Sequence, residues 1–312
     1  VAGAEVKDIL LPVPQISTQW QLAPNFSLLG YYQFAFEPNR LVPPGGYWSY
    51  SDVVGPGAQY IIGPGGIQIP RGNDIRPNGD DQWGVGARWR VFGDTELGAY
   101  YLHYNDMNPS VVTTYFPTLQ YQQKYFDHIK LTGLSFSTDL NGVNVAGETS
   151  YRQGAAVLVN TPTGPQATRG DVWQSNLSAI YSIGPTFLAA SQTLVGEISY
   201  VHAGNITPVM GSTTLTSTRN SAAFEVAWTL SYKNVFSGWD VDVPITYADD
   251  FTGQSALSGA LGSLTGVGDH RVTVGVNFTR LSNLKLGIVY AKFLGTPDPN
   301  NRPLADRDYV LA

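Results

Sequence analysis

The chain contains 312 residues, of which 13% are charged and 12% aromatic, with a formal net charge of -6. Soluble domains usually have about 25% charged residues, and no apolar run reaches the roughly 18 residues of a membrane-spanning helix, so a helical membrane protein is excluded. The sequence has no cysteine, which excludes disulfides and thiolate metal sites. The acidic balance and the lack of a basic cluster argue against a nucleic-acid partner.

Apolar and polar residues alternate along much of the chain. Phe224, Val226 and Trp228, for example, are interleaved with Glu225 and Ala227. Successive side chains of a strand point to opposite faces, so such segments predict strands with one apolar and one polar face. Turn residues bound twelve segments of this kind, at 14–22, 26–37, 82–93, 96–105, 128–138, 144–152, 172–182, 192–203, 222–233, 239–248, 270–281 and 284–294. A thirteenth begins near residue 306.

The connections between these segments alternate between short and long. The long ones are 38–81, 106–127, 153–171, 204–221, 249–269 and 295–305. Short turns on one rim and long loops on the other are the layout of outer-membrane barrels. We therefore predict an all-β fold, in which residues 1–312 form one antiparallel transmembrane β-barrel domain of the bacterial outer membrane, with the long loop 38–81 on the extracellular side.

Strand number and face assignment refine this prediction. Single-chain bacterial barrels have even strand counts, so twelve strands and the start of another predict a chain cut short at both ends, within a larger barrel. Segments 96–105 and 128–138 permit either phase of alternation. Pro244 cannot donate to a ladder and predicts a bulge or a locally broken pair. The alternative fold, a soluble β-sandwich or solenoid, would need apolar faces buried against each other and loops of no consistent parity.

The predicted polar face carries charges of both signs. They are Arg88, Arg90, Glu148, Arg152, Glu197, Glu225, Asp240, Asp242, Arg271 and Lys285. One interpretation is a charged constriction that selects a solute. The other, which we favour, is a set of ion pairs that fill a polar interior, because unpaired buried charge is very costly.

The loop 38–81 is unusually apolar for a solvated segment. Its candidate apolar contacts are Tyr60, Ile61, Ile62, Ile67 and Ile69, set between Pro-Gly turns. A freely solvated loop should not expose so much isoleucine. These side chains either line an entry path for apolar solutes or pack on the barrel rim, and the sequence does not separate the two.

Signals of enzymatic chemistry are weak. His103, His128, His202 and His270 have no metal-ligand spacing. No serine lies in a nucleophile-elbow context, and Ser199 with His202 is the nearest candidate pair. No strand–glycine loop–helix pattern indicates a nucleotide site. We expect no catalytic residues, no metal and no cofactor.

Several motifs resemble a family of proteobacterial outer-membrane proteins catalogued as domain of unknown function 1302. They are Gly3-Ala4-Glu5-Val6-Lys7 with Leu11-Pro12-Val13-Pro14, Tyr32-Gln33-Phe34, Gly147-Glu148-Thr149-Ser150-Tyr151-Arg152 and Pro303-Leu304-Ala305-Asp306-Arg307-Asp308-Tyr309-Val310. In that family the first motif follows several earlier strands, which implies a missing N-terminal part. The resemblance also implies location in the outer membrane of a Gram-negative bacterium, contact with its lipid, a periplasmic partner protein and an inner-membrane transporter of the resistance–nodulation–division type.

Pattern and resemblance together predict a barrel that passes or hands off hydrophobic or amphipathic small molecules or lipids across the outer membrane. The alternative is a structural or scaffolding outer-membrane barrel without transport. The apolar loop 38–81 favours the first, because a scaffold has no need of isoleucines near a mouth.

Overall fold

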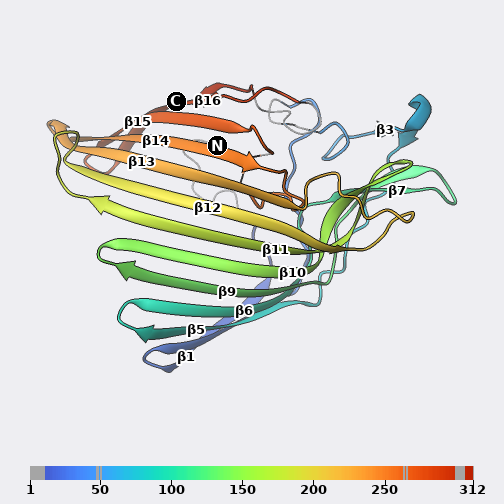
Figure 1. Cartoon of the computed structure of the whole chain (residues 1–312), viewed down its shortest axis with the longest axis horizontal. Helices are drawn as coiled ribbons and strands as arrows, with labels where there is room; N and C mark the ends of the chain where they lie inside the picture. The colour runs from blue at the N-terminus through green and yellow to red at the C-terminus, as the bar shows by residue number, and fades with distance from the viewer. Residues whose placement is uncertain are drawn as a thin grey trace.

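The computed structural model describes residues 11–46, 49, 51–262, 264, 266–298 and 306–311, so the motif at residues 3–7 and residues 303–305 of the closing motif lie outside it. Within this range, thirteen antiparallel strands form one sheet in which consecutive strands pair in the order of the chain, apart from two small hairpins (Figure 1). The strands are β1 (Gln15–Ala23), β2 (Phe26–Gln33), β5 (Gln82–Phe92), β6 (Thr95–Tyr104), β9 (Ile129–Leu140), β10 (Val143–Thr161), β11 (Gly164–Ile183), β12 (Ser191–Ile206), β13 (Asn220–Phe236), β14 (Trp239–Thr252), β15 (His270–Arg280), β16 (Leu284–Phe293) and β17 (Tyr309–Leu311).

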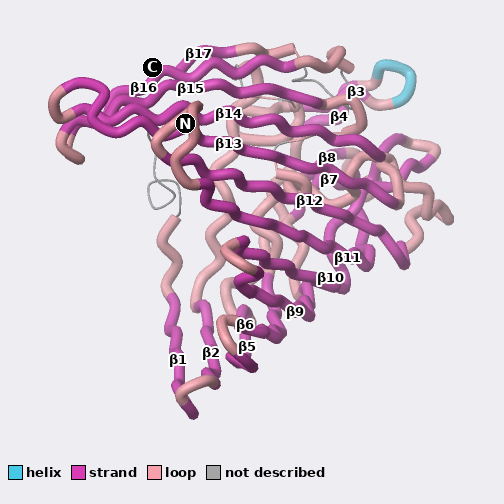
Figure 2. Tube along the Cα trace, turned by 60° about the vertical axis from the view of Figure 1, so that its left-hand side comes forward, coloured by secondary structure: helices cyan, strands magenta, loops and turns pink. Residues whose placement is uncertain are grey.

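All twelve predicted segments are strands, and the thirteenth begins at Tyr309 rather than near 306. The sheet curves along its length, and the short turns gather at one end of the strands while the long connections gather at the other (Figure 2). Among the described residues, β1 pairs only with β2 and β17 only with β16, so the sheet is open. The all-β antiparallel fold is therefore confirmed, whereas these strands do not close into a barrel. No described helix is long and apolar enough to cross a lipid bilayer.

The register keeps one apolar face across the whole sheet. Phe26 lies opposite Trp89, which lies opposite Leu97, which in turn lies opposite Phe136. The same phase continues to β16, where Phe278 lies opposite Leu286. It also resolves the two ambiguous segments, because Tyr101 of β6 and Leu134 of β9 both lie on this face. We call it the apolar face, and the opposite one the polar face.

Aromatic side chains border the apolar face at both ends of the strands. The row near the long connections contains Tyr32, Trp83, Tyr101, Tyr151, Trp173, Tyr200, Phe224 and Tyr247, and the row near the short turns contains Trp20, Trp89, Tyr181, Tyr232, Trp239 and Phe278. Neighbouring rings touch, as in Tyr151 and Trp173, whose centroids are 4.7 Å apart. Trp239 and Tyr247 lie eight residues apart on β14, about 26 Å at about 3.3 Å per residue.

Pro244 interrupts the β14–β15 ladder locally, over two consecutive pairs. The β14–β15 register runs from Asp242 opposite Asn277 directly to Ile245 opposite Val274, without a shift. Gly275 lies across from the proline, and a Cβ there would be 3.1 Å from Pro244 Cγ. The ring therefore occupies the space of the missing side chain, and the predicted disruption is a local break of the ladder rather than a bulge.

Three predicted loops contain strand structure. Segment 153–171 is not a loop, because β10 and β11 continue through it to a tight turn at 162–163. Loop 38–81 contains the hairpin β3 (Tyr60–Ile62) and β4 (Gln68–Pro70), joined through the short 3-10 helix η1 (Pro64–Gly66). Loop 106–127 contains the hairpin β7 (Ser110–Thr114) and β8 (Gln120–Lys124). Ala155-Ala156-Val157-Leu158-Val159 shows no alternation, so periodicity alone missed the extension.

The connection between β14 and β15, here the inserted loop (253–268), folds onto the polar face. Its Leu261 is 5% exposed and joins a buried apolar cluster on the extended ends of β10 to β13. The cluster members on the sheet are Ala155, Val157, Val159, Val172, Val201, Ala203 and Ala223, with Leu215 from a neighbouring connection. The polar face therefore has an apolar core at its long-connection end.

Candidate functional site

All ten predicted interior charges lie on the polar face of the sheet. The register places Arg88 opposite Gly98, Glu148 opposite Asn176 and Glu197 opposite Glu225. The charges are distributed over β5, β10 and β12 to β16. Six of them line three cavities rather than one ring, whereas Arg90, Asp240, Asp242 and Lys285 line none of the three. Asp240 lies apart near a short turn, where its carboxylate accepts from Lys233 Nζ at 3.0 Å. Asp242 accepts from Ser231 Oγ at 2.6 Å.

Arg88 faces a cavity of about 390 Å³ that also contains Glu96, Glu148 and Glu197. Its Nε lies 3.9 Å from Glu96 Oε1 and donates to Tyr100 Oη at 3.3 Å. Both members of this ion pair are nearly half exposed. Sequence reasoning missed Glu96, although its place opposite Arg90 follows once the phase of β6 is known.

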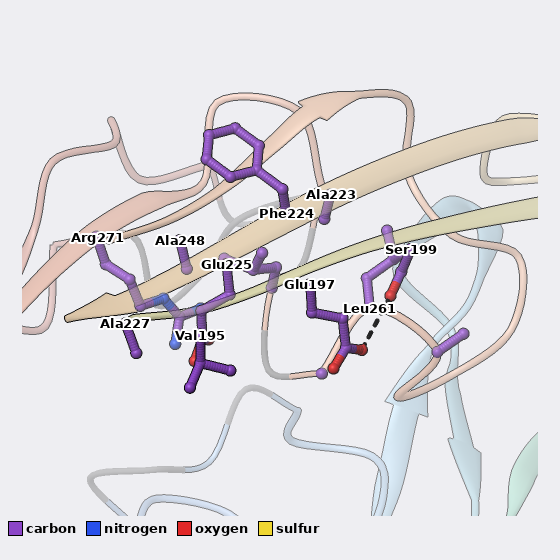
Figure 3. A pocket seen from close by; sticks show the side chains of 13 residues that line it. Val195, Glu197, Ser199, Ala223, Phe224, Glu225, Ala227, Ala248, Leu261 and Arg271 are labelled. Atoms are coloured by element: carbon purple, nitrogen blue, oxygen red, sulfur yellow. Dashed lines mark hydrogen bonds between the residues drawn. The ribbon is translucent and has the colours of Figure 1, made fainter. Parts of the chain in front are cut away.

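The inserted loop forms one wall of a second cavity, of about 220 Å³, shown in Figure 3. Glu197 and Glu225 lie directly opposite each other on β12 and β13, and Arg271 projects from β15. Like charges on opposite residues of a sheet repel each other. The guanidinium of Arg271 faces the same cavity and pairs with Asp269 at 3.1 Å. Leu261 and Ala223 supply apolar surface beside these groups, so the cavity has a charged side and an apolar side.

A third cavity, of about 280 Å³, lies on the other side of the inserted loop. Arg152 of β10 and Asp106 face it, together with Leu257 and Ala260 of the loop. Arg152 Nη1 donates to Gln174 Oε1 at 2.7 Å, and Gln174 Nε2 donates to the carbonyl of Ala260 at 3.1 Å. A hydrogen-bonded chain therefore ties the loop to an interior cation.

Two buried carboxyls lie where the inserted loop leaves and rejoins the sheet. Asp250 is 0% and Asp269 2% exposed, and the amide of Asp250 donates to the carbonyl of Asp269 at 3.0 Å. Burial raises the pKa of the Asp250 carboxyl to about 7, and the neighbouring Asp269 adds to this. On the other face, Asp249 pairs with His270 at 3.5 Å, so this level lies beyond the apolar band.

The sequence analysis did not predict that the inserted loop packs on the polar face. The signal was present, because Leu257, Leu261 and Leu264 punctuate a long connection in the same way as the isoleucines of loop 38–81. The sequence did not indicate on which face the loop packs, because a loop with apolar residues can pack on either face of a sheet.

The five apolar residues of loop 38–81 lie on the β3–β4 hairpin, which projects from the long-connection end of the sheet (Figure 1). Ile69 is buried at 5% exposure, whereas Tyr60, Ile62 and Ile67 are exposed. None of the five residues, including Ile61, lines the cavities of the polar face described above. A cavity of about 720 Å³ at the base of this loop instead contains Arg40, Arg71 and Arg76.

The histidines do not assemble a reactive centre in the described part of the chain. His202 lies on the apolar face and Ser199 on the polar face, so the nearest serine–histidine candidates point apart. His128 Nδ1 lies 3.0 Å from Asp127 at the rim, and His103 contacts the carbonyl of Asp81. No group of three or more His, Cys, Asp or Glu residues among the described positions could hold a metal ion.

Comparison with known proteins identifies a family and a structural likeness. The family described as "Protein of unknown function (DUF1302)" matches residues 1–312, the whole chain. No curated protein matches. The fold is similar to the crystal structure of the outer membrane channel DcaP of Acinetobacter baumannii, with 9% sequence identity and a TM-score of 0.40, over 89% of this chain and 77% of that chain.

Proposed function

Because the chain belongs to the DUF1302 family, whose description assigns no activity, we propose its function from the two faces of the sheet: an outer-membrane β-barrel channel that passes amphipathic or hydrophobic small molecules or lipids. The observation that carries the proposal is the single-phase apolar face, bordered by aromatic rows. Outer-membrane barrels have an outward apolar band about 25 Å tall between two aromatic girdles.

Exposure of the apolar face supports contact with lipid. Trp20 is 69%, Leu134 57% and Leu286 53% exposed, and they lie on strands spread over the sheet. Soluble monomers rarely expose apolar patches larger than a few hundred Å². An apolar face that continues over thirteen strands is stable where hydrocarbon covers it, because no charged group must be desolvated there.

The polar face supports a path for solutes. The inserted loop narrows it, and charged and apolar groups stand side by side in the cavity of Glu197, Glu225 and Arg271. A solute that satisfies both walls has an apolar body and a polar or charged group. This chemistry favours amphipathic molecules over sugars or small ions. A periplasmic partner protein and an inner-membrane transporter belong to the proposal through the family resemblance.

The scaffolding alternative predicts no flux at all. The protein is reconstituted into liposomes, and efflux of alkanesulfonates and alkyltrimethylammonium ions is measured as the chain grows from ethyl to hexyl. Flux that rises with chain length supports an amphipathic path. Flux that falls with chain length indicates an unselective aqueous pore, and the absence of flux for every solute indicates a scaffold; either result overturns the proposal.

A further inference from the structure

A groove of about 490 Å³ lies on the polar face at the β1 edge of the sheet, apart from the inserted loop. Its floor is formed by Leu29 and Tyr31 of β2, Gly86 of β5, and Tyr100 and Leu102 of β6. The volume falls within the range of about 300–1,000 Å³ that is typical of small-molecule sites.

Glycines let the large side chains of the groove lie flat against the sheet. A Cβ on Gly86 would lie 2.6 Å from Tyr100 Cδ1, and a Cβ on Gly84 would lie 2.6 Å from Leu102 Cδ2 and would also collide with the ring of Tyr31. The rings and the leucine therefore occupy the volume that side chains at 84 and 86 would fill. The result is a shallow apolar floor on a face that is otherwise polar.

The groove also lacks charge. None of its described lining residues is charged, and the wall on β1 consists of uncharged polar side chains such as Gln15, Ser17 and Gln19. Each of the four other cavities described above contains both an acidic and a basic residue. Arg88 lies outside the lining, and its Nε donates to the hydroxyl of Tyr100 at 3.3 Å. A charged group placed in this groove would have no counter-charge within the lining, so its partial desolvation is costly.

We propose that this groove binds one alkyl chain of an uncharged amphiphile, with that alkyl chain along the Tyr31–Tyr100 floor and the hydroxyl or carbonyl of the amphiphile at the glutamines of β1. An extended chain covers the apolar floor, and the amide groups of Gln15 and Gln19 offer both donors and acceptors. This inference rests on the proposed function, because it assigns a substrate class to the same polar face. The bound alkyl chain is that of a water-borne amphiphile rather than of a membrane phospholipid, because the groove lies on the face away from lipid.

The test is photolabelling of the protein in nanodiscs with a diazirine-bearing dodecanol, followed by peptide mapping. We expect label on the peptides of Leu29–Tyr31 and Tyr100–Leu102, displaced by excess dodecanol and not by excess dodecyltrimethylammonium. A parallel sample uses nanodiscs with a diazirine-bearing phosphatidylcholine, which we expect to label apolar-face residues such as Leu134. Label from the phospholipid at Tyr31 or Tyr100 would overturn the assignment to a water-borne amphiphile.

Gly86→Ala pushes the Tyr100 ring into the groove, and we expect it to weaken dodecanol binding about tenfold, which is about 1.4 kcal/mol. The matched control is Gly196→Ala on the apolar face, where an added Cβ meets no atom within 4 Å. Should Gly86→Ala fail to fold, Leu102→Gln keeps the volume and replaces the apolar floor with an amide.

Equal labelling of the polar face in the groove variant and the control would overturn the inference. Displacement by the cationic amphiphile as effective as by dodecanol would do the same. Labelling and liposome flux are independent, so flux without groove labelling refutes the groove alone, and groove labelling without flux refutes the channel alone.

Discussion

Leu261 anchors the inserted loop. The substitution Leu261→Ala tests whether this loop controls the width of the proposed solute path along the polar face. The side chain is 5% exposed within the apolar cluster on β10 to β13. Leucine-to-alanine changes at buried positions cost about 2–5 kcal/mol. The strands pair through their own ladders, so the cost falls on docking of the loop rather than on the sheet.

A cost of 2 kcal/mol, the lower end of about 2–5 kcal/mol, lowers the ratio of docked to undocked loop about thirtyfold. We expect a larger single-channel conductance in planar bilayers, with more frequent transitions between levels. Amide hydrogen exchange should quicken in 257–264 and stay unchanged in β10 to β13. Ser258→Ala is the matched control, because Ser258 lies exposed on the same loop.

Conductance at the wild-type value, together with unchanged exchange in 257–264, would refute the reasoning. A fall in the thermal unfolding temperature with unchanged conductance would show that the cluster stabilises the wall and that the loop does not narrow the path.

Arg88→Ala should cost less than about 1 kcal/mol of stability, because its pair with Glu96 is long and half exposed, and urea unfolding in detergent checks this; a cost above about 3 kcal/mol would restore the interpretation of a buried pair that holds the interior together. Because the pKa of Asp250 is raised to about 7 in the folded protein, its protonated form stabilises the loop base below pH about 4, and this contribution is lost as pH rises towards 7; exchange of the loop should quicken over that range, and Asp250→Asn should abolish the dependence. Pro244→Val should stabilise by about 1 kcal/mol by restoring a ladder hydrogen bond; urea unfolding in detergent checks this, and a lower midpoint than that of the wild type would contradict it.

The alternation of apolar and polar residues determined most of the sheet. Apolar residues at every second position decide which face of a strand is apolar, and turn residues decide where it ends, because both effects are local. The same reasoning placed the ten charged residues on one face and predicted the disruption at Pro244. Segments 96–105 and 128–138 could not be phased alone. Tyr101 and Leu102 are adjacent in the first, and the apolar positions change phase between Leu131 and Leu134 in the second. Only pairing with neighbours of clear phase fixed them.

Tertiary structure decided the contacts on the polar face. Whether Leu257, Leu261 and Leu264 pack inward or outward depends on the apolar surface that β10 to β13 offer, and that surface exists only once distant strands pair. Arg88 pairs with Glu96 across the short β5–β6 turn, and this contact depends on the phase of β6, which its own residues leave open. The flat apolar floor at Tyr31 and Tyr100 arises because glycines on a neighbouring strand leave room for the rings. The contacts of Leu261 and of the Tyr31 ring join residues far apart in the chain, so no local pattern encodes them.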